Sequence, residues 1–491
     1  MKKKSVIIGI LLVVLIAAVT LFLFNRKNST KKTNLSSQYA SVSSESCDCE
    51  TNWFPHQQTP PPEEGDGSPF DTISTTNCIF HQWSWQKFLW LTKPLPNGKP
   101  LFLDSLHLVS PEMESVSPQL GLKLVLSSYK QAGSEGVLIA NTKVNSGNNP
   151  ADTVYYSIHV DTKFMNKAIL MASLIHNKKL PYSNLETFPV GSLELKVSWI
   201  NASAIPKEKL PDYFTTNAAV QNNKGQYDIK SMALLGMHVV GVVKNHPEFI
   251  WATFEHKEMA PIYDKKSNSV TAENEMLFYE KGISYGLQGI IWSCDKPLTP
   301  NKASILYEYG VPKDINTGDY MRTSQSEPTN FNNIDNINKC VTSNLKDVFK
   351  NYFYNGSIWL NFDGMSSEQQ AKEIVTRKIS SAQPGDLARG SVNLANITME
   401  TYTQTFKKDL HDINNSNLVS CFTCHQSSNF DKAAGGKSPL YLSHVFESYL
   451  YTTKPKATAK NANSNSSKAQ SIEETKVLKL KQFQDFVRTN Q

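Results

Sequence analysis

The stretch Cys421-Phe422-Thr423-Cys424-His425 constrains this chain more than any other, because Cys-x-x-Cys-His is the spacing at which a polypeptide attaches haem covalently. Two thiols three positions apart can each add to one vinyl group of the porphyrin, and the adjacent imidazole then lies beneath the iron as its proximal ligand. Such a cofactor needs large apolar surfaces that exclude water. The motif therefore predicts a chain that folds around one covalent haem.

Two other uses of a cysteine pair fit this stretch less well. Zinc needs about four ligands, usually with a second Cys or His pair at similar spacing, and the sequence offers none. A thioredoxin-like redox pair normally follows a strand in a βαβ pattern, whereas this pair follows the polar run Asn414-Asn415-Ser416-Asn417. Haem is the favoured interpretation, with a disulfide or redox pair and zinc as the alternatives.

The N-terminus carries an apolar segment long enough to cross a membrane. Three lysines precede the uncharged run from Ser5 to Phe24, and basic residues follow it. At about 1.5 Å per residue this run spans about 30 Å, the thickness of one hydrocarbon core. A cleaved secretory signal usually has an apolar region of about 7–15 residues and ends near a small-x-small site. Here Ala17-Ala18-Val19 lies inside the run, and Phe22-Leu23-Phe24 ends it. We predict a retained membrane anchor with basic flanks over residues 1–32.

The haem motif resembles that of the c-type cytochromes. This resemblance implies thioether bonds from Cys421 and Cys424, axial ligation by His425, and attachment of the haem outside the cytoplasmic membrane. Positive charges flank both ends of the apolar run, so the positive-inside rule gives only a weak orientation. From the resemblance we expect a protein anchored in the cytoplasmic membrane, with its soluble part periplasmic or extracytoplasmic.

The formal net charge of +6 does not indicate nucleic-acid binding. Residues 1–32 hold seven of the 50 Lys and Arg and no acidic residue, so 43 basic residues face 44 acidic ones in the remainder. A nucleic-acid footprint needs a concentrated basic stripe, and none stands out. We expect no nucleic-acid partner.

Five cysteines lie outside the haem motif, namely Cys47, Cys49, Cys78, Cys294 and Cys340. An extracytoplasmic location permits disulfides, but five is an odd number and the pairing does not follow from sequence. Cys78 with Cys294, or Cys78 with one of Cys47 and Cys49, are the pairs we consider.

The chain between the anchor and residue 310 divides into a stalk and a β-rich domain. Residues 33–70 are rich in Ser, Thr, Asn and Pro, which predicts a disordered stalk because little apolar surface offsets the ordering entropy. Residues 71–310 begin with the tryptophan-rich run 78–91, interpreted as an aromatic core helix or alternatively as a wall of the haem pocket. Short alternating segments then predict antiparallel strands at 154–160 and 191–200.

A hairpin formed by residues 233–243 and 249–256 is the clearest β prediction, and it contains a cluster of possible metal ligands. These residues are Met237, His238, His246, Glu248, Glu255 and His256. Because adjacent strand residues face opposite sides, the cluster is interpreted as structural rather than as a metal site. Either Met237 or His238 could still face the haem.

The C-terminal part is predicted to be mostly helical. Residues 311–345 are rich in Asn, Thr and Asp and are interpreted as a connecting excursion. Residues 346–452 form the expected helical haem segment, with helices near 366–379 and 392–410, and residues 453–491 a linker and an amphipathic helix. The predicted class is α+β: an antiparallel sheet or sandwich body, a helical haem segment and one N-terminal transmembrane helix.

The second axial ligand of the iron has several candidates. Small cytochromes that share the motif take a Met well downstream of it, but this chain has no Met after Met399. His444, the one histidine downstream of His425, is the first choice, and Met399 is the second. Met237 is a distant third, and an open position is the fourth possibility.

Several stretches together resemble a largely uncharacterised group of bacterial cytochrome-c-like proteins with one haem motif near the C-terminus of a long extracytoplasmic chain. The stretches are Phe80-His81-Gln82-Trp83-Ser84-Trp85-Gln86-Lys87-Phe88-Leu89-Trp90-Leu91, Glu194-Leu195-Lys196-Val197-Ser198-Trp199, Gly236-Met237-His238-Val239-Val240-Gly241, His246-Pro247-Glu248-Phe249-Ile250-Trp251-Ala252-Thr253-Phe254-Glu255-His256 and the motif itself. The resemblance spans roughly residues 78–450 and implies haem and location but no substrate.

We therefore expect an electron-transfer protein that exchanges electrons with a redox protein partner or a small oxidant. If the sixth iron position is open, a peroxidase-like oxidoreductase is the alternative. A binding or sensor module with structural haem is the third hypothesis.

Overall fold

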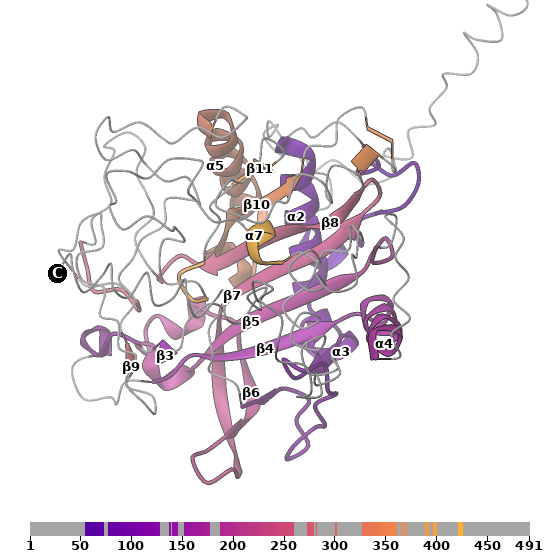
Figure 1. Ribbon diagram of the computed structural model, residues 1–491. Coiled ribbons are helices and arrows are strands. Elements are labelled where there is room, and N and C mark those ends of the chain that lie inside the picture. Colours follow the sequence, from indigo (N-terminus) through magenta and orange to yellow (C-terminus); the bar gives the residue numbers. More distant parts are fainter. Residues whose placement is uncertain are drawn as a thin grey trace, which may run out of the picture. The chain divides into compact units, whose positions relative to one another are not determined.

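The computed structural model describes fifteen segments, all within the unit Glu45–Gln491 (Figure 1). They are residues 55–72, 77–127, 137–138, 140–145, 152–176, 187–259, 273–278, 281, 300–301, 327–360, 365–366, 369–370, 388–391, 396–399 and 421–425. The predicted anchor at 1–32, His444 and the predicted helix within 453–491 lie outside these residues. No helix in the described segments is long and apolar enough to cross a membrane.

A large, mostly antiparallel sheet forms the centre of this unit, which confirms the β-rich prediction (Figure 1). Its main path runs through β1 (His107–Val109), β4 (Tyr155–Val160), β5 (Leu193–Asn201), β7 (Tyr227–Val243), β8 (His246–His256), β10 (Tyr352–Leu360) and β11 (Ala388–Gly390). Beside this path, β6 (Thr215–Gln221) pairs with β7 and, in parallel, with β2 (Val125–Leu126). A separate parallel pair joins β3 (Val137–Leu138) to β9 (Pro300–Asn301).

The predicted hairpin is present as the antiparallel pair β7 and β8. Its turn occupies Lys244 and Asn245, and Asn245 has a φ of 65°, a left-handed conformation that Asn tolerates better than most residues. The strands at 155–160 and 193–201 agree with the two other strand predictions.

Helices pack around this sheet, and the most buried is α2 (Asn77–Thr92). The other α-helices are α3 (Leu101–Ser105), α4 (Thr162–His176), α5 (Glu327–Asn344) and the single turn α7 (Cys421–Cys424). Short 3₁₀ helices are η2 (His56–Gln58), η3 (Thr142–Asn145), η4 (Ala202–Ala204), η5 (Leu210–Asp212) and η6 (Val348–Asn351).

The helix α2 covers one face of the sheet, which we call the α2 face. Phe88 stacks on Phe254 of β8 with ring centroids 4.1 Å apart, and Trp85 meets the same ring edge-on. Gly241 of β7 lets α2 approach closely, because a Cβ atom there would lie 2.7 Å from the indole of Trp83. The run 78–91 is therefore a core helix, as predicted.

The segment 55–72 covers the outer side of α2, so the predicted stalk is corrected for these residues. Glu64 forms a buried ion pair with Lys87 and accepts a hydrogen bond from the indole Nε1 of Trp83, at 2.7 and 2.8 Å. The side chain of Phe70 enters the main hydrophobic cluster. This coverage explains why α2 is buried on nearly all sides, its polar residues Ser84, Gln86 and Lys87 included. Residues 33–54 lie outside the described part of the chain.

The boundary predicted between a β-rich domain and a helical haem segment is also corrected. Residues 327–344, expected within a connecting excursion, form α5, which contacts α2 and β10. The strand β10 then pairs with β8, and β11 pairs with β10. Because C-terminal residues complete the same sheet, the two predicted parts share one core. The expected helices at 366–379 and 392–410 lie largely outside the described residues, although 396–399 form a turn.

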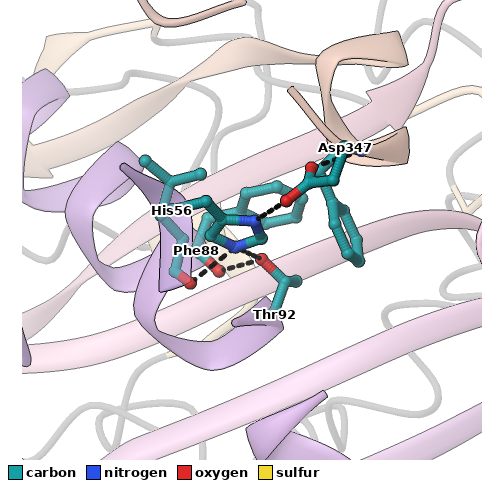
Figure 2. A network of polar contacts seen from close by, with 6 residues as sticks. His56, Phe88, Thr92 and Asp347 are labelled. Atoms are coloured by element: carbon teal, nitrogen blue, oxygen red, sulfur yellow. Dashed lines mark hydrogen bonds and ion pairs between the residues drawn. The ribbon is translucent and has the colours of Figure 1, made fainter. Parts of the chain in front are cut away.

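His56 fixes the covering segment to the rest of the fold (Figure 2). Its Nδ1 lies 2.5 Å from Oδ2 of Asp347, and its Nε2 lies 2.9 Å from the carbonyl oxygen of Leu89 and 3.0 Å from Oγ1 of Thr92. Asp347 also caps η6, because its Oδ1 accepts a hydrogen bond from the amide of Phe349. One carboxylate thus connects the N-terminal segment to the entrance of β10.

We expect Asp347→Ala to lower the free energy of unfolding by about 1–3 kcal/mol, because it removes a cap and leaves a buried imidazole nitrogen without its acceptor. Denaturant unfolding measures the change. Asp335→Ala is the matched control, since Asp335 pairs on the surface with Lys339 and such a pair contributes about 0–1 kcal/mol. Equal effects of the two substitutions would contradict this role of Asp347.

Three buried histidines should make the fold sensitive to mild acid. Burial lowers the pKa of His81, His159 and His256 from 6.5 to about 3, so the folded protein keeps them neutral where the unfolded chain binds protons. Their contribution is fully present above the unfolded pKa and is lost as the pH falls below it. Between about pH 7 and about pH 5 we expect a loss of about 2 kcal/mol for each histidine.

Denaturant unfolding at these two pH values tests the expectation. His159→Gln should reduce the loss by about a third, whereas replacing the exposed His107 should leave it unchanged. An unfolding free energy that is the same at both pH values would show that these histidines do not behave in this way.

Candidate haem-binding site

The haem motif forms one helical turn whose backbone brings a thiol and an imidazole together. The amide of His425 donates a hydrogen bond of 2.9 Å to the carbonyl oxygen of Cys421. Residues four apart lie on the same side of a helix, so Cys421 and His425 share one side of α7. Cys421 is half-buried, and the neighbouring Phe422 is buried completely. The motif is thus held by its own apolar side chain.

His425 rests on Trp251 in the middle of the sheet. The two rings are stacked with centroids 4.7 Å apart and planes inclined by 29°. His425 is only 6% exposed and Trp251 4%. Stacking on a large, rigid indole fixes the plane of the imidazole, and an aromatic pair of this kind contributes about 0.5–1.5 kcal/mol beyond its buried area.

Trp251 points away from α2, because side chains alternate along a strand. Its neighbours Ile250 and Ala252 belong to the main cluster that contains α2, whereas directly paired residues share the face of Trp251. Those paired residues are Val240 on β7 and Ile358 on β10, both buried. We call this side of the sheet the motif face. The tryptophans of α2 lie on the opposite face, so the alternative of α2 as a haem-pocket wall is not supported.

A row of polar side chains crosses the motif face next to Trp251. Lys196 of β5 pairs with His238 of β7, which pairs in turn with Thr253 of β8. All three are buried, and Nζ of Lys196 lies 5.0 Å from the ring centroid of Tyr156. On the α2 face the same three strands carry apolar residues such as Val197, Met237 and Phe254. At these positions the polar residues lie on the motif face and the apolar residues on the α2 face.

The turn at residues 396–399 covers the next row of the motif face. The amide nitrogen Nδ2 of Asn396 donates to Oγ1 of Thr253, the backbone amide of Ile397 donates to Oε2 of Glu255, and the hydroxyls of Ser198 and Thr398 are 2.6 Å apart. Gly236 makes this approach possible, because a Cβ atom there would lie 2.8 Å from Asn396. The turn therefore reaches the polar row at Thr253, and on its other side this row borders Trp251, on which His425 is stacked.

The predicted iron ligands occupy different surroundings. His425 lies on the motif face, as described. Met399 is buried in a second hydrophobic cluster with Ala233 and Leu235. Met237 pairs with Phe254 and lies in the main cluster on the α2 face, so the sheet separates it from His425. Cys424 follows in the same helical turn, and nothing is described of its side chain.

The cluster of possible metal ligands in the hairpin is dispersed, as the structural interpretation predicts. His246 binds Glu248 at 2.9 Å, and its ring packs against Phe80 of α2. His256 stacks on Tyr213 with ring centroids 3.7 Å apart. Among the described residues, no group of three or more His, Cys, Asp or Glu is placed to hold a metal ion. His238 alone among the three hairpin histidines lies on the motif face.

Sequence reasoning did not single out Trp251, Lys196 or Gly236 for this site. Trp251 and Lys196 lie in strands whose side chains alternate between two faces. The sequence shows this alternation, but it does not show which face the motif would cover. A glycine inside a strand often marks the close approach of another backbone, and that signal was available at Gly236.

Comparison with known proteins finds no protein-family model, no curated protein and no solved structure that matches this chain. The resemblance to cytochrome-c-like proteins thus rests on the sequence stretches quoted above.

The residues around α7 fit a covalent haem. One helical turn presents a thiol and an imidazole from the same side, and the imidazole plane is set by a buried indole. Val240 and Ile358 supply apolar surface beside it, and haem requires a largely apolar, water-excluding surrounding. Cys421 and Cys424 would hold the haem, and His425 would ligate its iron.

Replacing Trp251 should change the electronic spectrum of the haem-loaded protein. We expect Trp251→Leu to alter the ferric electron-spin-resonance signal, because the imidazole of His425 loses the surface that orients it. Haem staining on denaturing gels should remain, since the thioether bonds do not depend on Trp251.

Trp359→Leu is the matched control, because Trp359 is equally buried but packs against Phe80 on the α2 face. Both substitutions should destabilise the fold, by less than the cost of about 3–5 kcal/mol for truncating a buried Trp to Ala. If both variants give the wild-type haem signal, Trp251 does not position His425.

Proposed function

We propose that this protein is a membrane-anchored, extracytoplasmic monohaem c-type protein that transfers electrons through its covalently attached haem. The observation that carries the proposal is the position of His425, which is buried against Trp251 of the central sheet. A motif in an unattached tail would give its imidazole no such surface. Here the haem motif is packed onto the body of the protein.

The roles of the residues follow from the motif. Cys421 and Cys424 would form the thioether bonds and His425 would be the proximal ligand. A bound haem supplies one-electron cycling of its iron, while the chain orients the imidazole through Trp251 and shields it from water. The haem-binding segment is proposed to be mostly helical, of which α7 is the described part.

Two features support the proposed location. Cys78 and Cys340 are both disulfide-bonded, and disulfides form and persist mainly outside the cytosol. The apolar run from Ser5 to Phe24 is long enough for a transmembrane anchor. We propose that the N-terminal helix holds the soluble part on the periplasmic or extracytoplasmic side, where a redox protein or a small oxidant would be the partner.

Covalent haem should be lost with the motif cysteines. The full chain, produced together with the haem-maturation machinery, should give a haem-stained band on a denaturing gel, and the Cys421→Ala/Cys424→Ala double variant should give none. Thr423→Ala is the matched control, since it changes the same motif but keeps both cysteines and His425, and it should keep the stain. A wild-type protein that remains colourless would refute the proposal.

The spectrum of the same preparation separates a carrier from an enzyme. A low-spin iron with two protein ligands is expected for electron transfer. A high-spin wild-type iron that binds cyanide or CO readily would favour the peroxidase-like alternative, because it would have an open sixth position.

A further inference from the structure

We propose that His238 is the second axial ligand of the haem iron whose first ligand is His425. This inference rests on the proposed function, because it concerns the same haem. It replaces both His444 and Met399 with a residue of the central sheet.

The strand register places His238 beside the stacked pair of His425 and Trp251. His238 lies directly opposite Thr253, and Trp251 is two residues away along β8. Such diagonal neighbours are about 7–8 Å apart, and both side chains project from the motif face. The imidazole of His238 therefore rises next to the indole on which the imidazole of His425 rests.

His238 is buried on the face of the sheet that carries the motif. It is 8% exposed, in the middle of a strand that is paired on both sides, and Lys196 beside it is 6% exposed. At the neighbouring positions of the same strands, Val197, Met237 and Phe254 point to the opposite face and pack in the main hydrophobic cluster.

The other described candidates are less suitable. Met237 lies on the α2 face, and the thioether of Met399 is enclosed with Leu235 in the second hydrophobic cluster. His246 is bound to Glu248 beside α2, and His256 packs between Tyr213 and Tyr352. His238 is the histidine of β7 and β8 that shares a face with His425.

Ligation by His238 would explain how the sheet and the haem segment form one unit. The iron would join β7 to α7, although these two elements lie far apart in the sequence. Two imidazole ligands give a low-spin iron at a lower potential than Met ligation, which suits an electron carrier rather than a peroxidase.

The test uses full-length, haem-loaded protein and the spin state of its ferric iron. His238→Ala should convert the low-spin electron-spin-resonance signal to a high-spin signal, and added imidazole should restore the low-spin signal. His444→Ala and Thr253→Val should leave it unchanged, since Thr253 is a buried neighbour of His238 in the same row. Haem staining should persist in all variants because the thioether bonds remain.

His238→Met provides a second measurement in case His238→Ala does not fold. Methionine can ligate the iron, so this variant should stay low-spin with a raised reduction potential and a sulfur-to-iron charge-transfer band.

Three outcomes would overturn the inference: a low-spin signal that His238→Ala leaves unchanged, a spin-state change produced by His444→Ala instead, or a high-spin wild-type iron. In each of these the band still stains for haem, so the proposed covalent haem stands. A colourless wild-type protein would remove the proposed haem itself, and a high-spin wild-type iron would also favour the peroxidase-like alternative over electron transfer.

Discussion

The rest of the structure depends on one constraint: the central strands are buried on both faces. Along β5, β8 and residues 232–243 of β7 nearly every residue is shielded from water. Successive side chains point to opposite faces of the sheet, so each must pack against other residues on its own face. The α2 face meets this demand with aromatic packing, and the motif face meets it with polar side chains and segments from the C-terminal part of the chain.

The coverage comes from segments that are distant in sequence. The segment 55–72 wraps α2, the carboxylate of Asp347 connects that segment to the start of β10, and residues 396–399 and 421–425 lie on the motif face. The spectrum of a haem attached at α7 would consequently depend on whether the whole sheet is folded. This arrangement differs from a small cytochrome module attached to an independent domain, and it makes the sheet part of the proposed cofactor site.

The elements with a strong local pattern were predictable. Alternating and β-branched residues identified β4, β5 and the β7–β8 hairpin, because strand-favouring residue types are visible within a single segment of the sequence. The assignments that failed depend on distant partners. The segment 55–72 is polar by composition but is ordered by Glu64 and His56, and β10 was placed in a helical part because its partner β8 lies about 100 residues earlier in the chain.

The sequence by itself determined the haem motif, the apolar N-terminal run and the alternation of the central strands, because each is a property of neighbouring residues. Only the tertiary structure decided which face the motif covers. A strand pattern states that His238 and Met237 point in opposite directions, yet it cannot say which of them shares a face with His425. That choice follows from the contact of His425 with Trp251 and from α2 filling the other face.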